Sequence, residues 1–201
     1  MSVWGLISDV HGNLPALDEA LRVLSLHGAR RLAFLGDYLG RGDSDACARR
    51  IRDVADVAVV GNRDLDWQDR VAPETRQWVL SLPRSVALDG LLLAHGDARL
   101  TRHLGTNQIP RQFGEAWLEM DEHKARVLAF GHSHFARTWR KATADAAAEL
   151  LAASRVVLTD GRFFVNVGTT GLPFPGKGGP SVAVVDLAAG MIEHIPLTWQ
   201  A

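Results

Sequence analysis

Cysteine is nearly absent from this chain, since Cys47 is the single one among 201 residues. One thiol cannot form an intramolecular disulfide, and it excludes metal sites built from clustered thiolates. Excess charge of either sign is absent too: the formal net charge is −1 and the isoelectric point is about 6.7. Without a positive field we expect no double-stranded nucleic acid as partner, whereas small anionic substrates stay open.

Long apolar runs are also missing. No stretch reaches the ~18 apolar residues of a membrane span, and the first polar motif begins at Ser8, which leaves no room for a secretory leader. We therefore expect a cytoplasmic protein with no membrane partner. The 47% hydrophobic and 22% charged residues are ordinary for a globular protein, so residues 1–201 are predicted to form a single domain.

The first part of the chain alternates apolar runs with segments of helical periodicity. Strands are predicted at 3–7, 31–35 and 57–60, with helices after the first strand and at 44–52, where Ser44 is the candidate N-cap. Each strand leads into a polar loop. Open α/β sheets place their functional sites at such strand ends.

The second part contains more neighbouring strands. A helix begins at Pro73, and a hairpin is predicted for 86–88 and 91–94. The alanine-rich segment 141–154 is predicted to be a helix of about three to four turns, without a chemical role. Further expected elements are a helix at 112–123 and strands at 127–130, 155–158, 163–167, 182–185 and 192–198.

This asymmetry predicts the fold class. We expect an α/β fold with two mixed β-sheets packed face to face and helices on the outside, a four-layer α/β-β/α sandwich. One sheet would be built from βαβ units and the other from meanders.

Five predicted strand ends carry oxygen or nitrogen donors. Asp9 and His11 are two residues apart, and an extended loop would point both at one position. A carboxylate such as Asp37 can bridge two metal ions, because each of its oxygens can bind one. Such a pair clamps a phosphate and lowers the pKa of a bridging water toward ~7, which supplies hydroxide for attack on phosphorus. The candidate metal ligands are Asp9, His11, Asp37, Asn62, His95, His132 and His134.

The order of these motifs resembles that of the calcineurin-like metallophosphoesterases, over residues 3–187. The matching segments are Asp9-Val10-His11, Gly36-Asp37, Gly61-Asn62-x-Asp64, His95-Gly96 and Gly131-His132-Ser133-His134. The last segment and Asn166-Val167-Gly168-Thr169 look like the small bacterial phosphodiesterase branch, where the asparagine segment supports the site with backbone groups.

The resemblance implies two divalent transition metals, with manganese favoured and iron, zinc or nickel as the alternatives. Carried over position by position, it implies that one ion is bound by Asp9, His11, Asp37 and His134. It implies that the other is bound by Asp37, Asn62, His95 and His132.

Arg63 departs from the family pattern, which has a histidine here that assists the leaving group and an acid next to it, here Asp64, that orients the histidine. A guanidinium cannot donate a proton near neutral pH, but it can stabilise negative charge on a phosphoryl oxygen. The missing proton donor, worth about 10²–10⁴-fold where it operates, is either not replaced or is replaced by another histidine such as His103. The simplest role for Asp64 is an ion pair with Arg63.

Arg41 is the other candidate catalytic residue. The segment Gly36-Asp37-Tyr38-Leu39-Gly40-Arg41-Gly42 resembles the second motif of phosphoprotein phosphatases and diadenosine tetraphosphate hydrolases, where the arginine binds the substrate phosphate bidentately. We assign Arg41 to phosphate binding, and the alternative is a surface arginine in a glycine turn. Loop 98–110 is either a lid over the substrate or a plain connector.

Together these features predict a phosphoric ester hydrolase that acts on a small phosphodiester or nucleotide. A diadenosine polyphosphate or phosphoprotein phosphatase stays open because of Arg41. A non-catalytic metal-binding scaffold, like the retromer subunit of this fold, stays open because of Arg63. The expected partner is a small phosphate ester, and a homo-oligomer is neither required nor excluded.

Overall fold

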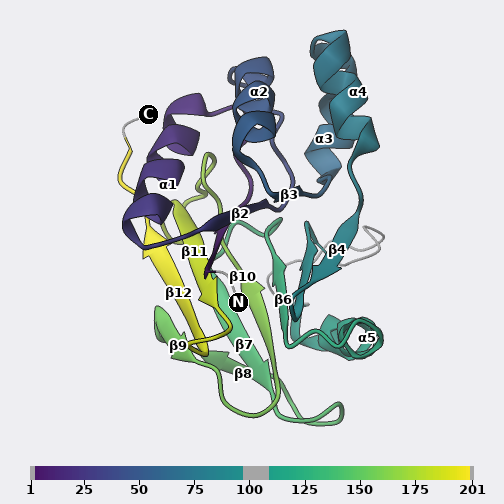
Figure 1. Cartoon of the computed structure of the whole chain (residues 1–201), viewed down its shortest axis with the longest axis vertical. Helices are drawn as coiled ribbons and strands as arrows, with labels where there is room; N and C mark the ends of the chain where they lie inside the picture. Colours follow the sequence, from purple (N-terminus) through teal and green to yellow (C-terminus); the bar gives the residue numbers. More distant parts are fainter. Residues whose placement is uncertain (1–2, 97–108, 200–201) are drawn as a thin grey trace.

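The computed structural model describes residues 3–96 and 109–199, so most of loop 98–110, including His103, lies outside the described residues. Two six-stranded mixed sheets are stacked on each other, and helices cover both outer faces (Figure 1). The predicted fold class is therefore confirmed.

The first sheet joins the N-terminal and C-terminal parts of the chain. Its central strand β1 (Val3–Ile7) pairs in parallel with β2 (Arg31–Phe34) and antiparallel with β11 (Ser181–Asp186). In sheet order its strands are β3 (Val57–Ala58), β2, β1, β11, β12 (Met191–Pro196) and β9 (Arg155–Val157).

The second sheet is formed by the middle of the chain. Its strand β6 (Val127–Phe130) lies in parallel between β5 (Leu91–Ala94) and β10 (Arg162–Asn166). In sheet order the strands are β4 (Ser85–Leu88), β5, β6, β10, β7 (Arg137–Lys141) and β8 (Glu149–Leu151). Each sheet thus mixes parallel βαβ pairs with antiparallel ribbons, and the expectation of one sheet of each kind was wrong.

Helices cover the two sheets unequally. The first sheet carries α1 (Leu14–Leu26), α2 (Ser44–Val54) and α4 (Pro73–Ser81), while the second carries α5 (Ile109–Glu122) (Figure 1). The short α3 (Asn62–Trp67) and the 3-10 turn η1 (Gln68–Arg70) lie between α2 and α4 in the chain.

Three hydrophobic clusters fill the three interfaces between these four layers. The first contains Leu17, Ile51 and Val79 from the helices together with Ile7 of β1. The second lies between the sheets, where Trp4 and Leu6 of β1 share a cluster with Leu93 and Val127 of the other sheet, and the third packs Phe113 and Met120 of α5 on that sheet's outer face. Burial on both faces explains why the central strands read as continuous apolar runs.

The N-cap of α2 is Asp43 and not Ser44. The side chain of Asp43 accepts a hydrogen bond from the backbone N–H of Ala46 at 2.9 Å. Ser44 already belongs to the first turn, and its hydroxyl donates to the Gly40 carbonyl at 3.1 Å. The predicted N-cap was therefore wrong by one residue. Both side chains are good caps, and only the local fold decides between them.

The helix predicted at 141–154 is not formed. This segment contains the end of β7, a turn, and β8, which pairs antiparallel with β7. Alanine favours a helix by propensity alone, but an isolated helix of this length is marginal in water. Pairing with β7 instead lets Ala148 pack against the third cluster and Leu151 against the second, so tertiary contacts override the propensity.

The described helices include none that is both long and apolar enough to cross a membrane.

Candidate metal centre

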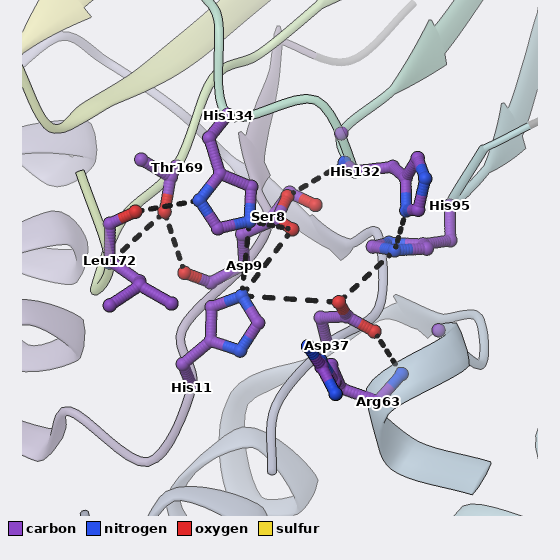
Figure 2. A network of polar contacts seen from close by, with 12 residues as sticks. Ser8, Asp9, His11, Asp37, Arg63, His95, His132, His134, Thr169 and Leu172 are labelled. Atoms are coloured by element: carbon purple, nitrogen blue, oxygen red, sulfur yellow. Dashed lines mark hydrogen bonds and ion pairs between the residues drawn. The ribbon is translucent and has the colours of Figure 1, made fainter. Parts of the chain in front are cut away.

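Four strands deliver six of the seven candidate ligands to one end of the sandwich, and the seventh, Asn62, is the first residue of α3. Asp9 and His11 follow β1, Asp37 follows β2, His95 follows β5, and His132 and His134 follow β6. The strands run in parallel within each pair, β1 with β2 and β5 with β6. Their carboxyl ends therefore share an edge, and Figure 2 shows the side chains converging from both sheets.

One donor group consists of Asp9, His11 and His134. The Nε2 atom of His134 lies 3.0 Å from Oδ1 of Asp9 and 3.2 Å from Nε2 of His11. Nε2 of His11 lies 3.6 Å from the same Asp9 oxygen. These three side chains thus present one donor atom each to a common position.

A second donor group consists of Asp37, His95 and His132. Nε2 of His95 lies 3.3 Å from Oδ2 of Asp37 and 3.3 Å from Nδ1 of His132. Asn62 joins the group, because its Oδ1 lies 3.1 Å from Nε2 of His95 and 2.9 Å from Nδ1 of His132.

Asp37 connects the two groups. Its Oδ2 atom faces His95 of the second group at 3.3 Å and Nε2 of His11 in the first at 3.9 Å. The other oxygen accepts the backbone N–H of Arg63 at 2.7 Å. One carboxylate oxygen is thereby held by the backbone while the other is shared between the groups.

The donor chemistry fits metal cations. Oδ1 of Asp9 is buried and makes no hydrogen bond within residues 3–96 and 109–199. The Nδ1–H groups of His95 and His134 donate to the carbonyls of Leu35 at 2.7 Å and Leu172 at 2.6 Å. In a neutral imidazole this leaves the Nε2 lone pair directed at the site, which is how metal-binding histidines are oriented.

The protonation equilibria reflect this crowding of donors. Burial opposes ionisation of Asp9, but the neighbouring imidazoles of His11 and His134 outweigh it and hold the Asp9 pKa well below its usual value. Burial likewise disfavours a charged His95, yet the adjacent Asp37 carboxylate prevails and raises the His95 pKa to about 10. The pKa of His134 is raised for the same reason, against its burial, by Asp9. Both shifts have the same cause, because a positive charge beside these carboxylates is favoured, and a metal cation bound there would supply such a charge.

The backbone at the strand ends is left-handed, not extended. The φ angles are 56° at Asp9, 51° at His11, 57° at Asp37, 66° at His132 and 58° at His134. The expectation that an extended loop aligns Asp9 with His11 was therefore wrong, although the two side chains do converge. Left-handed backbone at non-glycine residues is costly and concentrates at functional sites, where the surrounding fold enforces it.

Asp64 holds the backbone of the loop that contains Asp37. Its two carboxylate oxygens accept four backbone N–H groups at 2.8–3.0 Å, from Asp37, Tyr38, Leu39 and Gly61. Burial, and then the charge of Asp37, raises the pKa of Asp64 to about 7 against these hydrogen bonds. The expected Asp64–Arg63 pair is not formed, because the exposed Arg63 guanidinium faces Asp66 at 3.7 Å instead.

Asn166 supports the loop after β6. Its side-chain amide donates to the Gly131 carbonyl and to the Ser133 hydroxyl, both at 2.7 Å, and its oxygen accepts Gly168 N–H. Gly131 is required here because a Cβ would collide with Ser8 Oγ and with Asp9 Oδ2. The segment that begins at Asn166 thus supports the loop of His132 and His134 through the Asn166 side chain, and not through backbone groups alone.

Sequence reasoning missed three supporting residues. The Thr169 hydroxyl donates to the Asp9 carbonyl at 3.0 Å, and the Tyr38 hydroxyl, in the loop after β2, donates to the Val59 carbonyl, which follows β3, at 2.6 Å. The Phe174 ring stacks on His134, with ring centroids 4.6 Å apart. Thr169 is the last residue of the segment Asn166-Val167-Gly168-Thr169, so the sequence did contain a signal for it, but nothing in the sequence marks Phe174 within its Gly-Pro-rich stretch.

The two candidate arginines line one cavity of about 730 Å³ beside His11. Arg41 lies in the loop before α2, and Arg63 lies in the first turn of α3. The structure thus places Arg41 and Arg63 next to the first donor group, while their catalytic roles remain predictions.

Strand-end carboxylates and imidazoles gathered between two mixed sheets define the class of metal-dependent phosphoesterases. The family model for the calcineurin-like phosphoesterase superfamily domain matches residues 1–190 of this chain. The chain belongs to this superfamily, as its motifs predicted.

Two curated relatives match parts of the chain. The chain is 31% identical over 140 residues to phosphodiesterase YfcE of Escherichia coli K12, covering 63% of this chain and 66% of YfcE. It is 39% identical over 64 residues to the uncharacterized protein MJ0912 of Methanocaldococcus jannaschii, covering 31% of this chain and 26% of that protein. The chain thus spans less than two thirds of the length of either relative.

A solved structure shows the same fold. The metallophosphoesterase from Sphaerobacter thermophilus superposes with a TM-score of 0.81 at 23% sequence identity, covering 99% of this chain and 89% of that one.

Proposed function

We propose that this protein hydrolyses a small phosphodiester or nucleotide at a centre of two divalent metal ions. The observation that carries the proposal is the position of Asp37 Oδ2, which faces an imidazole nitrogen of each donor group, at 3.3 Å and 3.9 Å. Membership in the phosphoesterase superfamily supports the reaction class.

The donors fit two sites that share Asp37. Asp9, His11 and His134 with Asp37 would hold one ion, and His95, His132 and Asn62 with Asp37 the other. Mixed imidazole and oxygen donors suit manganese, which we favour, and also iron, zinc or nickel. When bound, the ions supply Lewis acidity and acidify the water that attacks phosphorus.

The chain's own residues then position the ligand loops and the substrate phosphate and stabilise the charge that develops in the reaction. Asp64 and Asn166 hold the loops of Asp37 and of His132–His134 in their left-handed backbone. Arg41, on the cavity wall, binds a non-reacting phosphate oxygen through its planar fork. Arg63 stabilises the negative charge that develops as the ester bond breaks, in place of a proton donor.

The two alternatives make different demands. A diadenosine polyphosphate or phosphoprotein phosphatase is favoured by the position of Arg41 on the cavity wall. A scaffold that binds metal without turnover would keep the same left-handed backbone at its five donor residues, and only Arg63, in place of the usual histidine, favours it.

The test measures metal content together with hydrolysis of bis-p-nitrophenyl phosphate, for the protein as purified, after chelation, and after manganese is restored. We expect two metal ions per chain and turnover that is lost on chelation and regained with manganese. Bound metal with no turnover on this diester, on a monoester or on a dinucleotide polyphosphate would overturn the enzyme in favour of the scaffold.

A further inference from the structure

A segment rich in proline and glycine passes beside the first donor group. Residues 171–180 read Gly-Leu-Pro-Phe-Pro-Gly-Lys-Gly-Gly-Pro, and we call residues 172–177 the strap. The carbonyl of Leu172 in the strap accepts the Nδ1–H of His134 at 2.6 Å (Figure 2). The strap therefore contacts a candidate metal ligand directly.

The start of the strap is fixed to the loop after β1. The N–H of Gly171 donates to the Asp9 carbonyl at 2.9 Å, and the N–H of Leu172 donates to the Thr169 hydroxyl at 3.1 Å. A Cβ at Gly171 would collide with the carbonyl of Val10, so only glycine permits this close approach. The Leu172 carbonyl is thereby held at a fixed position beside the loop of Asp9.

A tight turn brings the Phe174 and Lys177 side chains together. The N–H of Lys177 donates to the Phe174 carbonyl at 3.1 Å, and Gly176 between them has a φ of 77°. Proline at the second position and a left-handed glycine at the third are typical of a type II turn, and Pro175-Gly176 supplies both. The ammonium of Lys177 lies 5.5 Å from the centroid of the Phe174 ring. The same Nζ donates to the carbonyl of Ser133, in the loop after β6, at 3.2 Å.

The Phe174 ring restricts a motion of His134 that the hydrogen bond leaves free. A bond at Nδ1 fixes the tautomer of an imidazole, but the χ2 angle of histidine has broad minima, so the ring can still rock. The Phe174 ring lies against the imidazole at 17° and 4.6 Å, and this nearly parallel contact blocks the rocking. A metal ion must lie near the imidazole plane to meet the Nε2 lone pair. The stack therefore directs Nε2 toward the position that His134 shares with Asp9 and His11.

The strap contributes little to the hydrophobic core. The Phe174 ring is 42% exposed and Leu172 is 39% exposed. Neither residue belongs to the three hydrophobic clusters formed by the described parts of the chain. A ring left this exposed gains only part of the free energy of full burial. A change at Phe174 should accordingly affect His134 more than the stability of the fold.

The second donor group is oriented by other parts of the chain. Nδ1 of His95 donates to the Leu35 carbonyl at 2.7 Å, and its Nε2 faces Oδ1 of Asn62 at 3.1 Å. The His95 ring packs edge-on against His132, with centroids 5.1 Å apart at 82°. Leu35 directly follows β2 and Asn62 begins α3, so neither belongs to the strap. The strap therefore acts on one donor group and not on the other.

We propose that Phe174 and Lys177 are positioning residues, which hold the His134 imidazole in plane and thereby set the affinity of the first donor group for its metal ion. This inference rests on the proposed function, because it takes that group as a metal site. Phe174 acts on His134 through the stack, while Lys177 acts through the Phe174 ring and the Ser133 carbonyl. Loss of a partner that orients a metal-binding histidine lowers metal affinity about 10–100-fold.

Manganese binding to the chelated protein tests the strap. Manganese is titrated by calorimetry into wild type, Phe174→Leu, Phe174→Tyr and Lys177→Met, with Lys124→Met as the matched control at an exposed position. We expect Phe174→Leu to raise one of the two dissociation constants about tenfold, and Lys177→Met to raise the same one about threefold. Phe174→Tyr keeps the ring and should bind like wild type, as should Lys124→Met. The urea midpoint of the chelated proteins should not change.

Double variants assign the affected ion. His95→Gln disables the second donor group, and His11→Gln disables the first. We expect Phe174→Leu to weaken the ion that remains in His95→Gln about tenfold and to leave the ion that remains in His11→Gln unchanged. Equal weakening in both, or a Phe174→Leu protein that binds both ions like wild type, would overturn the inference while the proposed function stands. Wild-type protein that binds no manganese would reject the proposed function, and the role of the strap with it.

Discussion

The carboxylate of Asp64 accepts the backbone N–H of Asp37 at 2.9 Å, so a buried acid that faces no ligand position holds the residue shared by both donor groups. The same carboxylate accepts three further N–H groups from the two loops that flank the site. This arrangement explains why Asp64, the acid that follows Arg63 in the chain, forms no ion pair with it: its oxygens already accept four backbone N–H groups.

Replacing Asp64 with Asn should loosen the loop of Asp37. The amide nitrogen would meet backbone N–H donors, so at least one buried donor loses its partner at a cost of about 1–3 kcal/mol. We expect a lower free energy of unfolding in urea and weaker metal binding in calorimetry. Asp66→Asn is the matched control, since Asp66 is exposed in the same helix. Equal stability and metal affinity in both variants would refute this role of Asp64.

Replacing Asp37 with Asn should separate the two donor groups. The amide keeps the side-chain volume but removes the charge that faces both His11 and His95. We expect metal content, measured by mass spectrometry, to fall from two ions to one or fewer and turnover to be lost. Asp18→Asn, at a half-exposed surface position, should retain both. Full metal content in Asp37→Asn would show that Asp37 is not a bridge.

Replacing Arg63 with His should change leaving-group preference. An imidazole supplies the proton that a guanidinium cannot, so esters with alcohol leaving groups should react about 10-fold or more faster. Bis-p-nitrophenyl phosphate should gain little, because its leaving group departs as a stable anion and needs no proton. The measurement is kcat/KM for adenylyl-adenosine and bis-p-nitrophenyl phosphate in both proteins. An unchanged ratio would mean that residue 63 does not meet the leaving group.

His194 should make stability depend on pH, far from the donor groups. Burial lowers its pKa to about 4, and its Nε2 lies within hydrogen-bond distance, 2.9 Å, of the Thr138 hydroxyl on the other sheet. Because the unfolded chain binds the proton near pH 6.5, the neutral form stabilises the fold above pH 6.5. That stability is lost as the pH falls from 6.5 to 4, by roughly 1–3 kcal/mol.

The test compares urea unfolding of metal-free protein at pH 7.5 and pH 4.5 for wild type, His194→Gln and His27→Gln. Glutamine at 194 does not titrate, so its stability should fall less on acidification. His27 is exposed and serves as the control. The same loss in all three proteins would assign the acid sensitivity to other groups.

The strand-end motifs were sufficient to predict the family and the fold class, while the assignment of the candidate ligands to two metal ions stays a prediction. Their positions follow from local pattern, because short apolar runs define buried strands and parallel strands of one sheet present their carboxyl ends at one edge. The hairpin of β4 and β5 was predictable for a similar reason, since Asp89 and Gly90 both adopt the left-handed backbone of its turn. Metal identity, oligomeric state and cellular location remain predictions.

The sequence by itself determined which donors this protein carries and at which strand ends they lie, because those properties depend on residues close together in the chain. Only the tertiary structure decided how the donors face one another. Left-handed Asp37 depends on Asp64 from another element, the loop of His132 and His134 depends on Asn166, and residues 141–154 form strand because pairing with β7 outweighs helix propensity. Such contacts join residues distant in sequence, and their energies exceed the local preferences that a sequence pattern reports.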